Sequence, residues 1–405
     1  MSYSPKTYNI FKNVNSNKMC YNTKRGETVE KIGIICEYNP FHNGHIYHIN
    51  QIKKLYPESI IILVMSGNYT QRGTVSIMDK WEKTNIALNY VDLVVELPFI
   101  FSIQSADIFA KGAVQILDSL NVDKIVFGTE SLNIEKLTKM AKVQKTKEFN
   151  NLVKKYLNDG INYPTALSKA TNNLTKIKIE SPNDLLGLSY IKEIQKTKIT
   201  PITIQRTNSY HEKNLTNNIS SATSIREAIK KHKDIKPYVP RETYEALKKK
   251  MYFNDSYFSL LKYKIISEIN NLDKYLNVDE GIENRIKKYI YEATSLEELM
   301  KKIKTKRFTY NKINRMFTCI LCGITKDDAK KYQNPQYIRV LGFNKNGQKH
   351  LKEIKKKQTL PIITSYTNKY KMLELEMKAS YIYYSKQKDK VNLTLMEYKH
   401  KPIIK

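Results

Sequence analysis

The sequence reads Gly33-Ile-Ile-Cys-Glu-Tyr-Asn-Pro-Phe-His-Asn-Gly-His45 around its first apolar run. The stretch opens as a buried strand, breaks at Asn39-Pro40, and restarts as a helix near Gly44. Backbone N–H groups at a helix N-terminus that follows the first strand of a sheet form a phosphate-binding site. His42 and His45 lie on that turn, where both can face the same phosphate oxygens. Neither a dinucleotide fingerprint nor a P-loop occurs, so the stretch predicts a phosphate site of another kind.

Strand and helix patterns alternate on both sides of this turn along the first 235 residues. Apolar runs of four to eight residues are separated by segments with helical periodicity, which indicates a doubly wound, mostly parallel α/β sheet. The strands are expected at residues 32–37, 60–65, 92–97, 124–127 and 202–205, and the main helices at 45–55, 80–89, 105–120 and 224–231.

The strand pattern fades after about residue 240, and the rest reads as basic helices. Residues 301–405 hold 26 Lys+Arg against 7 Asp+Glu, which is +19 of the net charge of +30. We therefore expect a disordered extension over residues 1–28, a catalytic α/β domain over 29–235 and a basic, mainly helical domain over 236–405.

The charge of the whole chain predicts a polyanionic partner. Lys+Arg 69 against Asp+Glu 39 gives a sequence pI near 9.6. A surplus of this size repels itself within the fold, and nucleic acid is the usual partner of such proteins. Lys, Asn and Ile are abundant everywhere in the chain, so a compositional bias explains part of the surplus. Composition alone ranks nucleic acid ahead of an acidic membrane surface.

Hydropathy and cysteine usage predict a soluble, reduced, cytoplasmic protein. No apolar run approaches the roughly 18 residues of a transmembrane helix, and the polar N-terminal residues lack the apolar core of a secretory signal. Cys319 and Cys322 form a CxxC, but the surrounding MFTCILCGI reads as a buried helix and no second ligand pair follows. We expect a helical core pair there, no protein-held metal and no membrane.

The turn at residues 39–45 resembles the HxGH signature of the nucleotidyltransferase superfamily. Members of this superfamily attack the α-phosphorus of a nucleoside triphosphate and release pyrophosphate. The resemblance implies a Rossmann-like nucleotidyltransferase sheet, and it implies that His42 and His45 are the catalytic residues that stabilise the charge growing on the phosphates.

A second motif, Ile219-Ser-Ser-Ala-Thr-Ser-Ile-Arg226, is similar to the superfamily's ISSTxxR-like signature near the end of the sheet. The resemblance implies that hydroxyls and N–H groups around Ser224 open a helix onto the β- and γ-phosphates, with Arg226 as the cation. The extra Ala222 leaves open which hydroxyl takes which role.

The resemblance extends from about Lys31 to the C-terminus and narrows to one family, the tRNA(Met) cytidine acetate ligases. It is carried by five more segments: VMSGNYTQRG at 64–73, DLVVELP at 92–98, FGTE at 127–130, PNDLLG at 182–187 and KTKRFT at 304–309. The family implies that acetate and ATP give acetyl-adenylate. The acetyl group then moves to N4 of the wobble cytidine (C34) of elongator tRNA(Met), which makes N4-acetylcytidine. Acetyl-CoA takes no part. The 29–235 domain would then bind ATP, and the 236–405 domain would bind tRNA.

Carried over residue by residue, the family's nucleotide contacts fall along the first strand and turn. The expected ATP-binding residues are Ile35, Cys36, Glu37, Tyr38, Asn39, Pro40, Phe41, His42, Asn43, Gly44, His45, Ile46, Tyr47, His48, Gly128, Asn183, Arg206, Thr207, Ser224 and Arg226. On local evidence alone, Gly128 is equally well an ordinary strand-to-loop glycine, Asn183 an N-cap and Arg206 a surface arginine. Mg²⁺ is expected to enter bound through ATP, with few protein ligands.

Two further groups of residues are assigned to the other substrates. The loop after the second strand would hold the acetate or cytidine end of the site through Ser66, Asn68, Gln71 and Arg72. The tRNA would be bound by one basic face made of Lys304, Lys306, Arg307, Lys312 and Arg315, with Phe308 and Tyr310 as stacking aromatics. A solvated helix face is the plainer interpretation of that charge.

Two other functions remain open from the sequence. A small-molecule adenylyltransferase would share both motifs but gives no reason for a basic helical region. A non-enzymatic RNA-binding protein with a decayed nucleotide fold would not need His42, His45 and Arg226 intact. Pyrophosphate release that requires acetate separates the ligase from the first alternative, and any ATP turnover argues against the second.

Overall fold

The computed structural model describes residues 29–130, 133–178, 181–205 and 219–405. The expected disordered extension (residues 1–28) and two of the expected ATP-binding residues, Arg206 and Thr207, lie outside the described residues.

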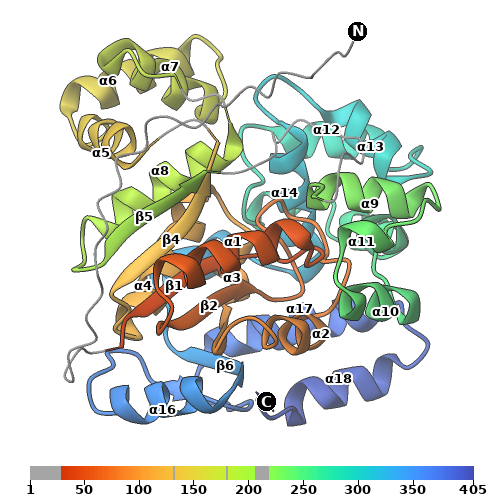
Figure 1. The fold of residues 1–405 in the computed structure, drawn as a ribbon. Coiled ribbons are helices and arrows are strands. Elements are labelled where there is room, and N and C mark those ends of the chain that lie inside the picture. The colour runs from red at the N-terminus through yellow and green to blue at the C-terminus, as the bar shows by residue number, and fades with distance from the viewer. Residues whose placement is uncertain (1–28, 131–132, 179–180, 206–218) are drawn as a thin grey trace, which may run out of the picture.

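In the described part of the chain, eight strands form one sheet (Figure 1). Their order is β5 (Thr200–Gln205), β4 (Lys124–Thr129), β1 (Lys31–Cys36), β2 (Ile60–Ser66), β3 (Leu93–Leu97), β6 (Ile338–Phe343) and β7 (Ile362–Ile363), with β8 (Ile403–Ile404) paired to β6. Strands β1 to β5 run parallel to one another, and β6 runs antiparallel to β3. The predicted doubly wound, mostly parallel sheet is thus confirmed, and its order reverses between β1 and β4.

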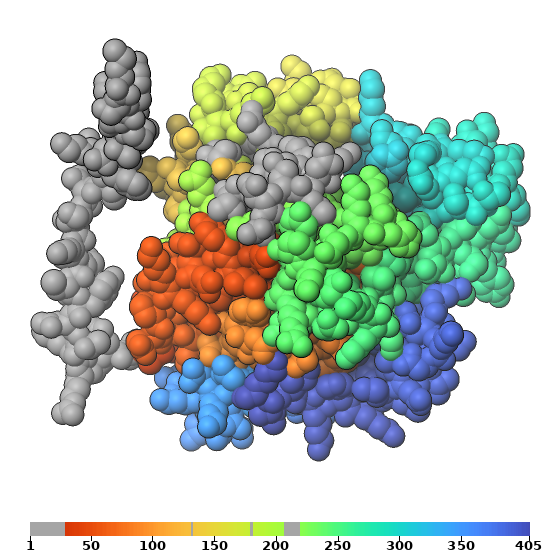
Figure 2. Space-filling view, turned by 45° about the vertical axis from the view of Figure 1, so that its right-hand side comes forward, coloured from red at the N-terminus to blue at the C-terminus, as the bar shows by residue number. Residues whose placement is uncertain are grey.

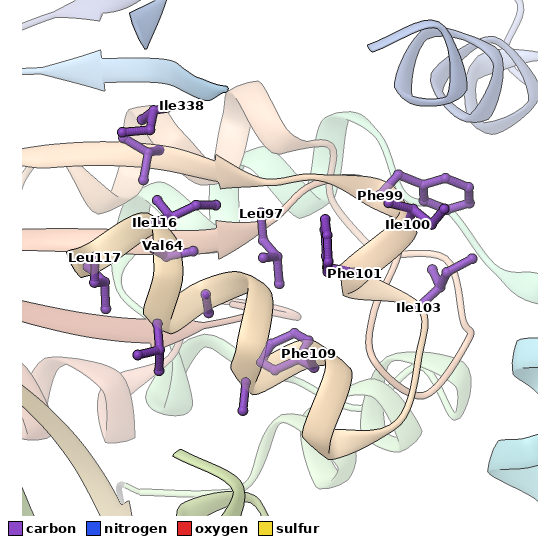
Figure 3. Packing of buried hydrophobic residues seen from close by; sticks show 14 of the residues in the cluster. Val64, Leu97, Phe99, Ile100, Phe101, Ile103, Phe109, Ile116, Leu117 and Ile338 are labelled. Carbon is purple, nitrogen blue, oxygen red and sulfur yellow. The ribbon is translucent and has the colours of Figure 1, made fainter. Parts of the chain in front are cut away.

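Both faces of the sheet are covered by helices. All seven residues of β2 are buried, and alternate residues enter different cores: Ile62 and Val64 on one face, Ile61 and Leu63 on the other. One face is covered by α1 (Asn43–Leu55), α2 (Lys80–Ala87), α9 (Ala222–Lys230) and α10 (Arg241–Lys249). The other is covered by α3 (Phe99–Ser102), α4 (Ala106–Ser119), α5 (Ile134–Val143) and α8 (Pro182–Ile194). Figure 3 shows α4 laying Phe109, Ile116 and Leu117 towards the strands.

Two groups of helices stand beyond these layers and have cores of their own. The hairpin of α6 (Lys147–Asn158) and α7 (Tyr163–Thr175) packs around Phe149 and Ala170. The second group consists of α11 (Phe258–Ser267), α12 (Ile282–Tyr289), α13 (Leu296–Ile303) and α14 (Tyr310–Cys322). Cys319 and Cys322 are buried in α14, so the prediction of a helical core pair is confirmed. Burial raises the pKa of each thiol to about 12.

The chain after residue 325 returns to the sheet, which the sequence did not predict. The predicted, mainly helical character of this region is confirmed, but β6 was not predicted, because a charged residue, Arg339, interrupts its apolar pattern. Helices α15 (Lys326–Lys331), α16 (Lys345–Ile354), α17 (Lys371–Tyr384) and α18 (Lys390–Lys399) accompany β6. Figure 1 shows this last, blue part of the chain beside β2 and α2. The domain division at residues 235 and 236 stays a prediction about function.

A buried cluster of five charged side chains joins this C-terminal segment to the first half of the sheet. Lys80 of α2 lies 2.7 Å from Glu96 of β3 and 2.6 Å from Glu397 of α18. Arg339 of β6 lies 3.1 Å from Glu96 and 2.9 Å from Glu397. Glu376 of α17 completes the cluster at 3.5 Å from Lys80. All five side chains are at most 4% exposed.

The protonation of Glu376 balances the charge of this cluster, which would otherwise hold three carboxylates and only two cations. Burial and the neighbouring Glu96 raise the pKa of Glu376 from 4.5 to about 8. Its carboxyl is therefore protonated at neutral pH, and one oxygen still accepts a hydrogen bond from the Phe99 N–H at 2.7 Å. With Glu376 neutral, two buried cations face two buried carboxylates, as a low-dielectric interior requires.

We predict that Glu376→Gln flattens the dependence of stability on pH. The native protein must keep a proton that the unfolded chain releases above about pH 4.5, so its free energy of unfolding falls as the pH rises towards about 8. This group contributes a slope of up to about 1.4 kcal/mol per pH unit. Urea unfolding between pH 6 and 8 should show the wild type losing stability relative to Glu376→Gln. The matched control is Glu374→Gln, on the exposed side of α17, which should keep the wild-type slope. Parallel curves for wild type and Glu376→Gln would contradict the assignment.

Candidate active site

A cleft of about 780 Å³ lies at the carboxyl ends of the strands, where β1 and β4 both contribute residues. Ligands of open α/β sheets bind at this edge, at the point where the strand order reverses. The phosphate turn and the starts of α7, α9 and α14 all contribute residues to the lining of the cleft.

The N-terminus of α1 presents the two histidines. His42 is the N-cap, and its Nδ1 accepts a hydrogen bond from the Gly44 N–H at 3.0 Å. The Nδ1 of His45 accepts from the His42 N–H at 3.2 Å, and the two rings lie 3.8 Å apart. Because each Nδ1 is an acceptor, each neutral ring carries its proton on Nε2, which suits donation to a phosphate oxygen. A Cβ at Gly44 would lie 2.8 Å from the His42 ring, so the turn requires glycine there.

The residues before the histidines fix the path of the turn. Tyr38 adopts a left-handed conformation with φ of 50°, and its ring packs edge-on against Phe41 at 4.7 Å. Phe41 is fully buried and stacks on His45 at 5.5 Å. The Asn39 side chain accepts from the Ile77 N–H at 2.8 Å. Asn39 and Phe41 therefore anchor the turn from below, while Tyr38 and His45 line the cleft.

The second motif meets the first across the cleft. Ser221 is the N-cap of α9, and its hydroxyl accepts from the Ser224 N–H at 3.1 Å. Arg226 donates to the backbone oxygen of Asn39 and, at 3.2 Å, to the hydroxyl of Thr223. Ser221, Thr223 and Arg226 line the cleft, whereas the buried Ser224 does not. Ala222 is the first residue of α9, so the departure from the short motif falls at the helix start.

Most of the expected ATP-binding residues are brought together. The cleft is lined by Ile35, Cys36, Glu37, Tyr38, Asn39, His42, Gly44, His45, Tyr47, His48, Gly128, Asn183 and Arg226. Pro40, Phe41, Asn43, Ile46 and Ser224 are not among its lining residues. The N-cap of α8 is Ser181 rather than Asn183, and the Asn183 amide donates to Glu130 at 2.5 Å.

The loop after β2 divides into a buried and an exposed half. Ser66 and Asn68 are buried beneath the cleft, and the Asn68 side chain bonds the Lys80 N–H and the Ser380 hydroxyl at 3.0 and 3.1 Å. Gln71 and Arg72 line the cleft. The Gln71 N–H donates to a Glu37 carboxylate oxygen at 2.6 Å. Of the four residues assigned to the acetate or cytidine end, only these last two line the cleft.

Sequence reasoning missed Lys83, which joins the end of β1 to the turn after β2. Its ammonium is fully buried and donates to the backbone oxygens of Glu37, Ser66 and Gly67 at 2.9, 2.9 and 2.7 Å. Burial lowers the pKa of Lys83 to about 7, whereas its three carbonyl partners favour the charged form, which alone has three N–H donors. The only signal in the sequence is helical spacing, since Lys80, Lys83 and Ala87 fall on one inward face of α2.

The residues assigned to tRNA do not form one face. Lys304, Lys306 and Arg307 are exposed on the loop before α14, and Arg307 lies 3.8 Å from Glu280. Lys312 lies 3.9 Å from the centre of the Phe308 ring. Arg315 turns towards the cleft and donates to the Gln71 backbone oxygen at 3.4 Å.

The expected stacking role of Phe308 is wrong, because Phe308 is 3% exposed and belongs to the core of the α11–α14 group. Tyr310 is 44% exposed. Phe308 fills the core of the α11–α14 group just before α14 begins. The basic residues that flank it on both sides gave no sign of this burial.

Among the described residues, no three His, Cys, Asp or Glu side chains lie close enough together to hold a metal ion. No helix within the same residues is both long and apolar enough to cross a bilayer.

Comparisons with known proteins identify relatives over nearly the whole chain. The family model described as HIGH Nucleotidyl Transferase matches residues 29–397. A tRNA(Met) cytidine acetate ligase of Geobacillus sp. is 41% identical over 379 residues, which cover 88% of this chain and 94% of the relative. One of Clostridium novyi is 40% identical over 375 residues, with 87% and 94% covered.

Two solved structures share the fold. Thermotoga maritima TmcAL in its apo form superposes with a TM-score of 0.86 at 29% identity and covers 93% of this chain and 99% of that one. The same protein bound with alpha-thio ATP gives a TM-score of 0.84 at the same identity and coverage.

We predict that Lys83→Met disables the candidate active site. Three buried carbonyl oxygens lose their donor, at about 1–3 kcal/mol for each group left unsatisfied. The ends of β1 and β2 are then free to separate, and a displacement of about 1 Å at a reacting group costs on the order of a hundredfold in rate. ATP turnover should fall by that factor at a temperature where the variant remains folded.

The control for this prediction is Lys80→Met, which destabilises the fold by leaving Glu96 and Glu397 to share Arg339, but Lys80 donates to none of the three carbonyls. Its turnover per folded molecule should stay within a few-fold of wild type. Equal losses in both variants would show that Lys83 acts only through stability.

Proposed function

Since this chain belongs to the HIGH nucleotidyl transferases and, among them, to the tRNA(Met) cytidine acetate ligases, we propose that it joins acetate to the wobble cytidine of elongator tRNA(Met) at the expense of ATP. The observation that supports this most directly is the meeting of two helix N-termini, those of α1 and α9, in one cleft with His42, His45 and Arg226. Such an arrangement suits a nucleoside triphosphate, because N–H dipoles, imidazoles and a guanidinium converge on anionic oxygens.

The first step is adenylation of acetate. A carboxylate oxygen of acetate attacks the α-phosphorus of ATP, the bond from that phosphorus to the α,β-bridging oxygen breaks, and pyrophosphate leaves. Acetate is already ionised at neutral pH, so this step needs no general base. Its barrier lies in bringing one anion to another, and His42, His45 and Arg226 lower it by stabilising charge on the phosphates. Gln71 and Arg72 would hold the acetate.

The second step moves the acetyl group to RNA. The N4 amine of cytidine attacks the carbonyl carbon of acetyl-adenylate, the bond between that carbon and the phosphate oxygen breaks, AMP leaves, and N4 loses a proton. The lone pair of N4 is delocalised into the ring, so an activated acyl donor is required. The mixed anhydride must be shielded from water.

The partners follow from this reaction. They are ATP, acetate and elongator tRNA(Met), with no part for acetyl-CoA or a membrane, and the tRNA places the enzyme in the cytoplasm. Mg²⁺ would enter on the triphosphate, and the lack of a three-residue ligand cluster in the described part of the chain is compatible with that route. Residues 29–235 would carry adenylation, and the exposed cations Lys304, Lys306 and Arg307 would serve tRNA binding by residues 236–405.

We predict that His42→Ala and His45→Ala each abolish acetate-dependent exchange of labelled pyrophosphate into ATP while leaving tRNA binding nearly intact. Loss of one donor to the developing charge costs about 2.7–4 kcal/mol, or on the order of a hundredfold to a thousandfold in rate. His42 also caps α1, so His42→Asn is the matched control: asparagine restores the cap but not the imidazole. It should be more stable than His42→Ala and equally inactive. Wild-type exchange in both alanine variants would overturn the assignment.

A further inference from the structure

One part of the cleft has no assigned ligand. It lies between the start of α7 and the start of α14, and its lining includes Asn162, Tyr163, Ser168, Thr309 and Asn311. These side chains are neutral and polar or aromatic. A triphosphate would gain little from them, whereas a nucleobase offers both hydrogen-bonding edges and a stacking face.

The geometry of phosphoryl transfer indicates what belongs there. The entering oxygen and the leaving pyrophosphate stand roughly in line across the α-phosphorus. If pyrophosphate leaves towards the α9 N-terminus and Arg226, acetate must lie on the opposite side, near Gln71 and Arg72. The acetyl carbon of the adenylate is then on that side as well, and the amine that attacks it must approach from the α7–α14 part of the cleft.

Contacts tie this part of the cleft to the residues around Gln71. The Gln71 amide donates to the Gln104 backbone oxygen at 2.9 Å, which places the start of α4 beside it. Asp107 of α4 lies close enough to Tyr163 to contribute, after burial, to raising the pKa of its hydroxyl. On the other side, Asn162 donates to the Lys306 backbone oxygen at 3.2 Å. The start of α7 is thus joined to the basic loop before α14.

Tyr163 is the aromatic residue suited to hold a base here. It is the first residue of α7, and 49% of it is exposed although it lines the cleft. An exposed ring on a helix start is a rigid platform, and stacking on such rings is the usual way in which proteins hold an unpaired base. Phe308, in contrast, is committed to a core.

The hairpin that carries Tyr163 is itself basic. Residues 147–176 hold five lysines against two acidic residues, and all five lysines are exposed. Lys154 and Lys155 stand near the end of α6, just before the turn that leads to Tyr163. Figures 1 and 2 both show the hairpin, in yellow, projecting above the sheet on the same side as the cyan helices α12 and α13.

We propose, on the basis of the function above, that the α7–α14 part of the cleft receives the wobble cytidine as an unstacked nucleoside on the ring of Tyr163, and that the α6–α7 hairpin is an RNA-contacting element. The anticodon loop lies between two basic lips, one formed by Lys154 and Lys155 and the other by Lys304, Lys306 and Arg307. The base enters the cleft between them and presents N4 to the acetyl carbon.

The first test separates the two half-reactions. In Tyr163→Ala, acetylation of tRNA should fall about tenfold to a hundredfold in kcat/KM, while acetate-dependent pyrophosphate exchange stays within twofold of wild type. Tyr163→Phe keeps the ring and should retain acetylation within threefold. The control is Tyr263→Ala, which should change neither activity, because Tyr263 is 73% exposed on α11.

Equal loss of both half-reactions in Tyr163→Ala would place Tyr163 in the adenylation site, and unchanged acetylation would overturn the proposal. Absence of acetate-dependent exchange in the wild type would instead refute the proposed function.

The second test locates the base directly and does not depend on turnover. An anticodon stem–loop RNA with 5-bromocytidine at the wobble position is irradiated on the wild-type enzyme, and the cross-linked peptide is identified by mass spectrometry. A cross-link within residues 162–168 supports the proposal, and one confined to other segments overturns it.

Charge reversal tests the two lips. Lys154→Glu/Lys155→Glu and Lys306→Glu/Arg307→Glu should each weaken binding of the stem–loop. The slope of log K against log salt should become shallower by about one for every phosphate that the protein no longer neutralises. The control reversal is Lys349→Glu/Lys352→Glu on α16, which packs by Gly347 against the start of β3, the opposite end of that strand from the cleft. If the hairpin reversal binds like that control, the hairpin does not bind RNA.

Discussion

The positions of the two strand ends beside the cleft, those of β1 and β2, depend on one buried ammonium group. Lys83 reaches the backbone oxygens of Glu37, Ser66 and Gly67, and so fixes the separation between the end of β1 and the turn after β2. Two parts of the site continue from those two ends: the histidine turn continues from Glu37, and the loop with Gln71 continues from Gly67. Parallel strands supply no hydrogen bonds to each other beyond their last residues. The chain segments after β1 and β2 diverge at this point, and the three N–H donors of Lys83 take the place of the missing ladder hydrogen bonds.

The C-terminal segment closes the structure beneath these strand ends. Lys80, one turn before Lys83, is held by carboxylates from β3, α17 and α18, while Arg339 brings β6 to the same cluster. Gly67 lies directly above, since a Cβ there would meet Glu96 at 2.4 Å. The Ser66–Gly67 turn is therefore packed directly against the cluster. A region that the sequence assigned to RNA binding also completes the core of the sheet beside the cleft.

The sequence predicted what local pattern determines. Periodicity and turn chemistry place three features to within a few residues. These are the strands with continuous apolar runs, the helix start at His42 and the second motif at Ser221–Arg226. The sequence could not predict β6, since Arg339 reads as a surface residue unless Glu96 and Glu397 are known to surround it. Lys83 and Phe308 were missed or misassigned for the same reason: each is defined by partners distant in sequence. Ser66 and Asn68 were assigned to a ligand by their place after β2, but in the fold they point into the protein.

The central claim is that acetate itself, activated by ATP, is joined to the wobble cytidine. Purified enzyme is incubated with elongator tRNA(Met), ATP and ¹³C-labelled acetate, and the digested nucleosides are examined by mass spectrometry. The account predicts N4-acetylcytidine that carries both labelled carbons, located in the anticodon fragment, dependent on ATP and unaffected by added unlabelled acetyl-CoA. Unlabelled product, label that acetyl-CoA dilutes, or no modified cytidine from an enzyme that turns over ATP would contradict it.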